Sequence, residues 1–500
     1  MVESNGLSCK AISHEQCHCS RGKVVGGTGA INGMMYVPGT RFDYDRWQEL
    51  GNIGWGYDDV KPYFEKSVKP AGNDTHPRGY VALNKFPVFD GDVDTMMFQG
   101  AQELGLNIVE EFKEGNYLGY GRVKGTIENG RRLSTLEGHL GRVSYRPNLH
   151  IIKNAHVTKL DFDMSAQKVT AVEFLLREEY KLKVEVTKEA IISAGSLNSP
   201  KILMLSGIGP EDHLQSFNIP VVKNLAIGQN LQDHVLINVY MRLPGTPLNE
   251  TLVLDAIYEY LIHKTGPLAS HGTTSLTGFI NTNISQASEY PNVEMHHFII
   301  RRGDMLGLET YLNGVHTRQD LRAYFKDIVN NYDMLGICVL IGHPKSRGNI
   351  QLKSESPLQP PIINGNYLSM ESDIEVLLEA MKHLMRLEQT QAFKEKQVEI
   401  VHIPLAECDQ HEFKSDEYWR CYLTYFSGAC YHPAGTVKMG PEQDEQACVD
   451  SRLRVKGIDN LRVIDASIMP YITSSITNAP TIMIAEKGAD LIKEDWNELA

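Results

Sequence analysis

The segment 184–209, VEVTKEAIISAGSLNSPKILMLSGIG, contains the pattern of a strand, a turn of small residues and a helix. An apolar, β-branched run ends at Ser193, the small residues Ala194-Gly195-Ser196 follow, and the apolar pattern predicts a helix to Leu205. A helix N-terminus directly after a strand offers free N–H groups to a phosphate or to a cofactor edge. The segment therefore predicts an α/β fold with a ligand at this turn.

A second unit of this kind lies near the C-terminus. Leu461–Asp465 predicts a short buried strand that ends in an acidic residue, and a helix is expected from about Pro480 to Lys493. Upstream, the runs 149–160, 169–176 and 183–193 predict consecutive strands. Strand-to-helix units at both ends indicate one discontinuous nucleotide-binding module with a second module inserted in it.

The middle of the chain predicts mixed sheet and helix. Strand-like segments occupy 292–300 and 334–341, and 373–387 is an amphipathic helix pattern. The segment 44–68 is also helical in pattern. Its expected core positions are Trp47, Leu50, Trp55, Val60 and Phe64.

Composition excludes several function classes. The 500 residues carry a formal net charge of -13, spread along the chain, which argues against a nucleic-acid partner. No apolar run reaches the roughly 18 residues of a membrane span. The first twenty residues also lack the pattern of a signal peptide.

The eight cysteines predict disulfides rather than a metal site. Cys9, Cys17 and Cys19 lie close together but lack a paired C-x-x-C, so no metal is expected. We expect Cys408 to pair with Cys421, and Cys9 with Cys17 or Cys19. Glycosylation sequons at Asn73, Asn249 and Asn283 also favour an oxidising compartment.

Four motifs, two of them within the segments described above, occur in a fixed order. They are Arg21–Met34 (RGKVVGGTGAINGM), Gly195–Gly209, Tyr431–Gly440 (YHPAGTVKMG), and the segment from Leu461 through Asp465-Ala466-Ser467 to Thr481. Together they resemble the glucose-methanol-choline oxidoreductases, and most closely the insect glucose dehydrogenase-like branch. The resemblance extends from about Cys17 to the end of the chain.

The resemblance implies an FAD-dependent alcohol dehydrogenase or oxidase. The fold that the resemblance implies for this chain is α/β. It consists of a Rossmann-like FAD-binding module, truncated at its N-terminus, with an inserted α+β substrate module of mixed or antiparallel sheet plus helices. The segments 16–60, 145–237 and 427–493 would form the first module, and 61–144 and 238–426 the second. The family's two halves correspond to 1–235 and 343–490.

The same resemblance assigns roles to individual residues. An alcohol would give hydride to flavin N5 while His432 takes its hydroxyl proton, and a neutral imidazole suits that role near neutral pH. The cofactor-binding residues implied are Gly27, Thr28, Asn32, Gly33, Met34, Met35, Val157, Ala194, Gly195, Asp465, Ala466, Asn478 and Ala479. An ordinary capping role is the alternative for Asp465.

The chain departs from the family pattern in two places. The expected opening strand and G-x-G-x-x-G turn, which bind the FAD pyrophosphate, are not found. We therefore expect a fragment, a splice product or a truncated gene model; the alternative is a natural short protein with weakened flavin affinity. The second departure is Ile476, at the site of a family His or Asn that binds the substrate oxygen. Asn478 is a candidate catalytic substitute, two residues away.

The substrate and the electron acceptor stay open at this stage. A sugar, a sterol such as an ecdysteroid, or an aromatic alcohol is compatible with the motifs, and the acceptor is oxygen or a quinone-like compound. An extracellular location is implied for the full-length family protein. The alternative function is a catalytically silent binding or structural protein with the same fold.

Overall fold

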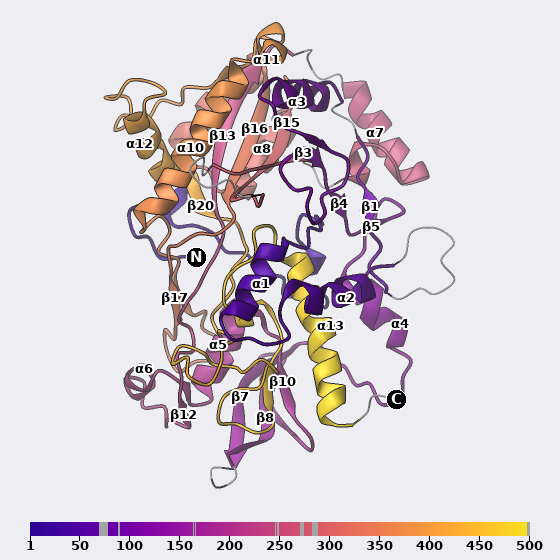
Figure 1. Cartoon of the computed structure of the whole chain (residues 1–500), viewed down its shortest axis with the longest axis vertical. Coiled ribbons are helices and arrows are strands. Elements are labelled where there is room, and N and C mark those ends of the chain that lie inside the picture. The colour runs from indigo at the N-terminus through magenta and orange to yellow at the C-terminus, as the bar shows by residue number, and fades with distance from the viewer. Residues whose placement is uncertain are drawn as a thin grey trace.

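The protein consists of a large sheet with helices and, next to it, a smaller α/β part (Figure 1). The structure, a computed structural model, describes residues 1–69, 79–88, 91–163, 165, 167–245, 247, 250–270, 275–282 and 289–497. The α/β fold with an inserted mixed-sheet part, predicted from the sequence, is confirmed.

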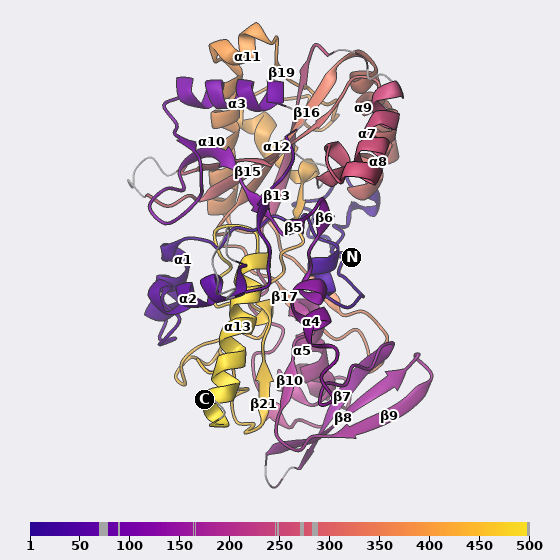
Figure 2. The same ribbon diagram turned by 90° about the vertical axis from the view of Figure 1, so that its right-hand side faces the viewer.

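The smaller part contains the strand-turn-helix units predicted from the sequence (Figure 2). Three strands form an antiparallel sheet, and two more form a parallel pair that leads into helix α5. The antiparallel strands are β7 Ala155–Asp163, β8 Lys168–Leu176 and β9 Tyr180–Glu185; the parallel strands are β10 Ala190–Ile192 and β21 Leu461–Val463; the helices are α5 Gly195–Leu205 and α13 Asn478–Asp495.

The predicted strand at 183–193 is wrong as a single element. Its first half is the end of β9, which pairs with β8, and its second half is β10, which pairs with β21. Asn460 hydrogen-bonds to the chain on both sides of this change of partner. Its side-chain amide donates to the Lys188 carbonyl, and its backbone carbonyl accepts from the Ala190 N–H. An apolar pattern cannot reveal such a switch, because both halves are extended.

The predicted helical segment 44–68 is two helices, α1 Arg41–Glu49 and α2 Tyr57–Ser67. Of the five expected core residues, Leu50 is wrong, since it lies in the connection and is 37% exposed. The other four are buried. Trp47 donates from its indole to the Tyr471 carbonyl at 2.9 Å, which ties α1 to the C-terminal loop.

Over the described residues, the large sheet has eight strands, mostly antiparallel, in the order β19-β13-β16-β15-β14-β3-β2 with β20 beside β13. They are β2 Ile108–Val109, β3 Gly119–Arg122, β13 Val235–Leu243, β14 Leu276–Ile280, β15 Val293–Ile300, β16 Asp333–Ile341, β19 Glu399–Ile400 and β20 Ser427–Ala429. The first three residues of β13 and all of β20 fall within the predicted cofactor-binding segments. The division into two modules stays a prediction.

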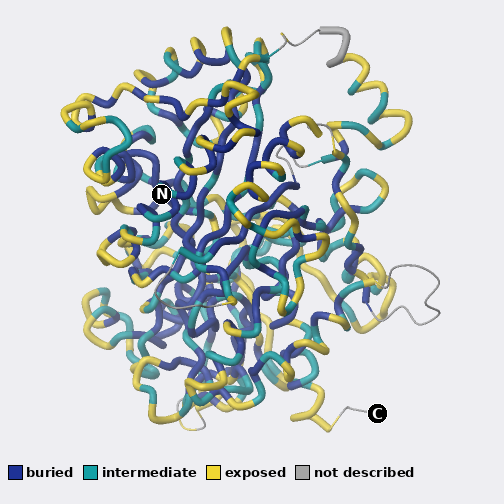
Figure 3. Tube along the Cα trace, turned by 45° about the horizontal axis from the view of Figure 1, so that its top comes forward, coloured by how far each residue is buried: buried dark blue, intermediate teal, exposed yellow. Residues whose placement is uncertain are grey.

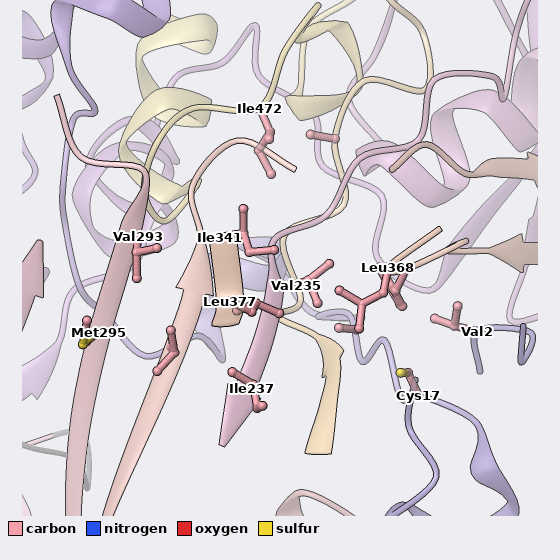
Figure 4. Packing of buried hydrophobic residues seen from close by; sticks show 14 of the residues in the cluster. Val2, Cys17, Val235, Ile237, Val293, Met295, Ile341, Leu368, Leu377 and Ile472 are labelled. Carbon is pink, nitrogen blue, oxygen red and sulfur yellow. The ribbon is translucent and has the colours of Figure 1, made fainter. Parts of the chain in front are cut away.

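Different helices pack against the two faces of this sheet. Val235 and Ile237 of β13 and Val293 and Met295 of β15 are among the buried side chains of the main core, with Leu377 of helix α10 Glu371–Glu388 (Figure 4). On the opposite face Tyr240 and Phe298 pack against Tyr311 of α8 Met305–Gly314. Side chains alternate between faces along a strand, so this face also carries Leu236 and Asn238.

The buried residues form a nearly continuous core through both parts (Figure 3). Two disulfides join Cys9 to Cys17 and Cys408 to Cys421, as predicted, while Cys19 is a free thiol. The predicted sequon asparagines lie outside the described residues.

Candidate active site

His432 lies just after β20, on a backbone that is held from three sides. Its N–H donates to Asp233 Oδ1 at 2.8 Å, the Cys430 N–H donates to the His234 carbonyl, and Arg21 Nη1 donates to the Tyr431 carbonyl at 2.6 Å. Tyr431 has a φ of 62°, a left-handed conformation that costs a residue with a side chain about 1–3 kcal/mol. The surrounding contacts therefore impose the position of His432.

The imidazole of His432 contacts a second buried histidine. The two Nδ1 atoms of His432 and His234 are 2.9 Å apart. Nε2 of His234 lies 2.8 Å from the Thr473 carbonyl oxygen and 3.2 Å from that of Gly342. Burial lowers the pKa of His432 well below its ordinary value, and His234, Arg21 and His296 act in the same direction. His432 is therefore neutral near pH 7 and able to accept a proton.

The segment 230–234 (NLQDH) connects His432 to the C-terminal loop. Asn230 donates to the Gly435 carbonyl at 3.1 Å, and Gln232 donates to the Pro470 carbonyl at 3.1 Å and accepts from the Ile472 N–H. No role was predicted for this segment. A run of polar residues directly before an apolar strand was the available signal.

The C-terminal loop is also fixed by Asp43 of α1. Its buried carboxylate accepts from the backbone and hydroxyl of Ser474, at 2.9 and 2.7 Å, and from His343 Nε2 at 2.6 Å. Thr40 donates to it from both its backbone and its hydroxyl. Asp43 thus positions the loop that carries Thr473 and Ile476.

The glycine-rich loop forms an open surface beside this loop. Gly27 has a φ of 57°, and a Cβ built there would meet no atom of the described residues within 4 Å. The same holds at Gly33, whereas at Gly29 the Cβ would lie 3.8 Å from Asn478 Oδ1. Asn32 Oδ1 accepts from Arg132 at 2.7 Å and from the Met34 N–H at 3.0 Å. Space for a ligand therefore exists along the loop.

Other predicted cofactor residues are placed around this loop and the C-terminal helix. Thr28 accepts from the Gly22 N–H through its hydroxyl. Met34 is buried, while Met35 packs against the small apolar cluster that contains Ile476. Asn478 and the buried Ala479 begin α13. The structure brings these segments together, and their contacts with a cofactor stay a prediction.

Asp465 joins three of the predicted motifs. Its Oδ2 accepts from the Gly195 N–H at 2.8 Å and the Ser199 hydroxyl at 2.5 Å. Its Oδ1 accepts from the backbone and hydroxyl of Ser467. Asp465 thus caps structure within the protein, as the capping alternative expects, and its carboxylate has four protein donors.

The third motif joins the same assembly through backbone contacts. The Gly435 N–H donates to the Ala466 carbonyl at 3.1 Å, and the Thr436 hydroxyl donates to the Ser196 carbonyl at 2.7 Å. Gly195, at φ 80°, has open space where a Cβ would be, and Ala194 before it is exposed. Val157, predicted at the adenine edge, lies half-buried in β7.

The sheet face that carries Asn238 is polar near His432. Thr277, His296, Cys338 and Asn238 lie opposite one another on four adjacent strands. In the next row, Glu294 lies between Phe279 and Leu340. His234, directly before β13, continues the alternation onto this face.

Glu294 is buried, and both oxygens of its carboxyl group lack hydrogen bonds from the described residues. It is 1% exposed, and no donor in the described part of the chain hydrogen-bonds to either carboxylate oxygen. Its nearest basic atom is His296 Nε2, 3.1 Å from Oε1 but in poor hydrogen-bond geometry. A buried carboxylate without donors is costly unless a ligand supplies one.

Ile476 lies in an apolar cluster at this face. It is 8% exposed and packs with Val37, Tyr117, Val123 and Phe279. Phe279 stands opposite Glu294 in the sheet, so the cluster and the polar rows adjoin.

The residues fit both ends of an elongated dinucleotide such as FAD. Open glycine surfaces lie at Gly27 and Gly33 and at Gly195 on the α5 N-terminus, and the buried Ser196 hydroxyl has no hydrogen-bond partner among the described residues. Arg21, the first residue of the glycine-rich motif, contacts the Tyr431 carbonyl next to His432. A glycine-rich cradle combined with a neutral histidine is typical of flavin-dependent oxidoreductases that act on alcohols. The chain belongs to the GMC oxidoreductase family, whose two models match residues 1–236 and 344–485.

Individual relatives agree with this assignment. The chain is 36% identical over 506 residues to glucose dehydrogenase (FAD, quinone) of Drosophila melanogaster, covering 99% of this chain and 78% of that protein. It is 29% identical to ecdysone oxidase of Spodoptera littoralis, with 99% and 82% covered. Formate oxidase of Aspergillus oryzae shares the fold, with a TM-score of 0.82, 24% identity, and 96% and 85% of the chains covered.

The family places the chain among FAD-dependent enzymes that act on CH–OH groups. Their substrates are small molecules. None of the helices in the described ranges combines the length and the apolar character needed to cross a bilayer.

Proposed function

We propose that the chain oxidises a small alcohol that carries further hydroxyl groups, with His432 as the base. The observation that supports this proposal best is the neutral imidazole of His432, which His234 and Asp233 hold in place. Arg21 of the glycine-rich motif contacts the carbonyl of the preceding residue, Tyr431. When bound, FAD supplies the acceptor for the hydride that leaves the carbinol carbon. His432 receives the hydroxyl proton, and Gly27, Asn32, Gly33, Met34, Met35, Asn478 and Ala479 line the flavin end.

The polar sheet face favours a polyhydroxylated substrate over an aromatic alcohol with a single hydroxyl. Glu294 needs a hydrogen-bond donor, and a second hydroxyl on the substrate supplies one. His296 and Asn238 add further polar groups on the same face. Sugars and hydroxylated sterols have this chemistry.

For the acceptor we propose a quinone-like compound, and for the location an extracellular one. The proposed acceptor is taken from the similarity to the Drosophila glucose dehydrogenase (FAD, quinone). Two disulfides support an oxidising compartment.

Turnover of a substrate panel tests the proposal. The FAD-loaded protein is offered a hexose, an ecdysteroid and benzyl alcohol, each with a quinone or with oxygen as acceptor. We expect the hexose or the ecdysteroid, with the quinone, to give the highest kcat/KM. Preference for benzyl alcohol would contradict the substrate class, and faster turnover with oxygen would contradict the acceptor.

Glu294→Gln is expected to raise KM for the preferred polyol about tenfold, because an amide accepts a weaker hydrogen bond from a hydroxyl than a carboxylate does. The kcat value should change less. Steady-state kinetics measure both, and benzyl alcohol is the control substrate, whose KM should stay unchanged. An equal rise of KM for both substrates would show that Glu294 does not contact the extra hydroxyl.

Ile476→Asn is expected to raise kcat by about tenfold or more, because a positioned polar group at the substrate oxygen assists proton transfer. Burying the amide costs roughly 1–3 kcal/mol of stability, which thermal unfolding measures. Ile476→Val is the matched apolar control. A folded Asn variant with unchanged kcat would show that Ile476 does not limit turnover. If the wild type and the folded Asn variant are both inactive, the catalytically silent binding protein is favoured.

A further inference from the structure

We propose that His234 is a positioning residue that fixes the tautomer of His432 and leaves Nε2 of His432 as its free proton acceptor. The inference rests on the proposed function in taking His432 as the base. It concerns which of the two ring nitrogens is able to receive a proton, since a neutral imidazole has one N–H and one lone pair.

The hydrogen-bond partners of His234 determine its own tautomer. Its Nε2 lies within hydrogen-bond distance of two carbonyl oxygens, those of Thr473 at 2.8 Å and Gly342 at 3.2 Å. Carbonyl oxygens only accept, so Nε2 of His234 must carry the proton. In the neutral ring, Nδ1 of His234 is then a bare acceptor.

The short contact between the rings transfers this constraint to His432. With the Nδ1 atoms 2.9 Å apart and Nδ1 of His234 bare, the proton of the hydrogen bond belongs to Nδ1 of His432. The lone pair of His432 is therefore on Nε2. The opposite arrangement needs an imidazolium at His234, which is 1% exposed.

The surroundings of His234 keep it neutral. Burial is the largest influence and lowers the pKa of His234. Glu294 across the sheet face raises this pKa, and His343 lowers it, but the net direction is downward. His234 is thus a neutral acceptor near pH 7.

The neighbouring residue Asp233 fixes the backbone of the same histidine. It accepts from the His432 N–H at 2.8 Å and from the Tyr367 hydroxyl at 3.0 Å. Two consecutive residues therefore hold His432. The Asp233 carboxylate binds the main-chain N–H of His432, and the His234 ring contacts its imidazole. A purely structural histidine would not need a bare nitrogen aimed at the base.

Two substitutions separate the tautomer role from simple packing. In His234→Asn, Oδ1 occupies the place of Nδ1 and still accepts from His432, while the bonds to Thr473 and Gly342 are lost. In His234→Gln, the side-chain amide reaches the place of Nε2 and keeps the carbonyl contacts, while the acceptor for His432 is lost.

The readouts are the tautomer of His432, by ¹⁵N NMR of histidine-labelled protein, and kcat. The His432 signal is identified by its absence in His432→Asn. We expect the Nδ1–H form in wild type and His234→Asn, with kcat within a few-fold. In His234→Gln we expect a mixed tautomer, and kcat lower by about 10- to 100-fold at unchanged KM.

An Nε2–H signal for His432 in the wild type would overturn the proposal, and so would full kcat in His234→Gln. If His234→Gln does not fold, the His432 tautomer in the wild type and in His234→Asn still tests the proposal. The NMR result does not need turnover. If the tautomers are as predicted but the protein oxidises no alcohol, the proposed function is wrong and the positioning role of His234 is supported.

Discussion

His432→Ala is expected to lower kcat/KM by roughly 10²–10⁴-fold, the usual contribution of a positioned general base. The alcohol proton then has no acceptor, because the ring that His234 and Asp233 hold in place is missing. Steady-state kinetics on the preferred alcohol measure the loss. The visible spectrum should show unchanged FAD, since removal of the ring leaves the proposed FAD contacts at Gly27, Gly33 and Gly195 intact.

His150→Ala is the matched control, because this histidine is exposed and belongs to none of the four motifs. Its kcat/KM should equal that of the wild type. Wild-type activity in a folded, FAD-loaded His432→Ala variant would remove His432 from the mechanism.

Asp465→Ala is expected to lower the free energy of unfolding by about 3–5 kcal/mol, since four donors lose a buried charged acceptor. Those donors belong to Gly195, Ser199 and Ser467, which connect α5 to the C-terminal segment. We expect a fall of several degrees in the thermal midpoint. Differential scanning calorimetry of the wild type and the variant measures it.

Asp459→Ala serves as control, because Asp459 lies exposed in a turn just before β21. Its midpoint should stay close to that of the wild type. An unchanged midpoint in Asp465→Ala would mean that the four hydrogen bonds contribute little, and that the Asp465 carboxylate is available for the cofactor.

The main elements of the site were predictable from the sequence because they are local. Strand, small-residue turn and helix at 184–205 form a continuous pattern, and the motif around His432 is a single stretch. The disulfide of Cys408 with Cys421 was also predictable. The ends of that loop lie close in sequence, 13 residues apart.

The partners of His432 were not predictable in this way. His234 is 198 residues away in the sequence, and Asp43 meets Ser474 across 431 residues. Polar residues before an apolar strand are common. The periodicity of the sequence does not indicate that Asp233 and His234 are buried against a distant loop. Glu294 was missed because a glutamate within a strand is usually solvent-exposed.

Boundaries within continuous patterns were also missed. The run 183–193 changes its strand partner without a change in its extended pattern, and Leu50 has the helical spacing of a core residue but lies in the connection after α1. Tertiary contacts decide both cases, and local propensity does not.

Anaerobic mixing of the FAD-loaded protein with its preferred alcohol tests the central claim most directly, because it isolates oxidation of the alcohol from the acceptor. We predict that the visible flavin absorbance bleaches in the wild type, and that bleaching slows by roughly 10²–10⁴-fold in His432→Ala. Persistent absorbance in the wild type with every alcohol of the panel, in protein that holds FAD, would contradict the assignment of an alcohol-oxidising site to His432 and its neighbours.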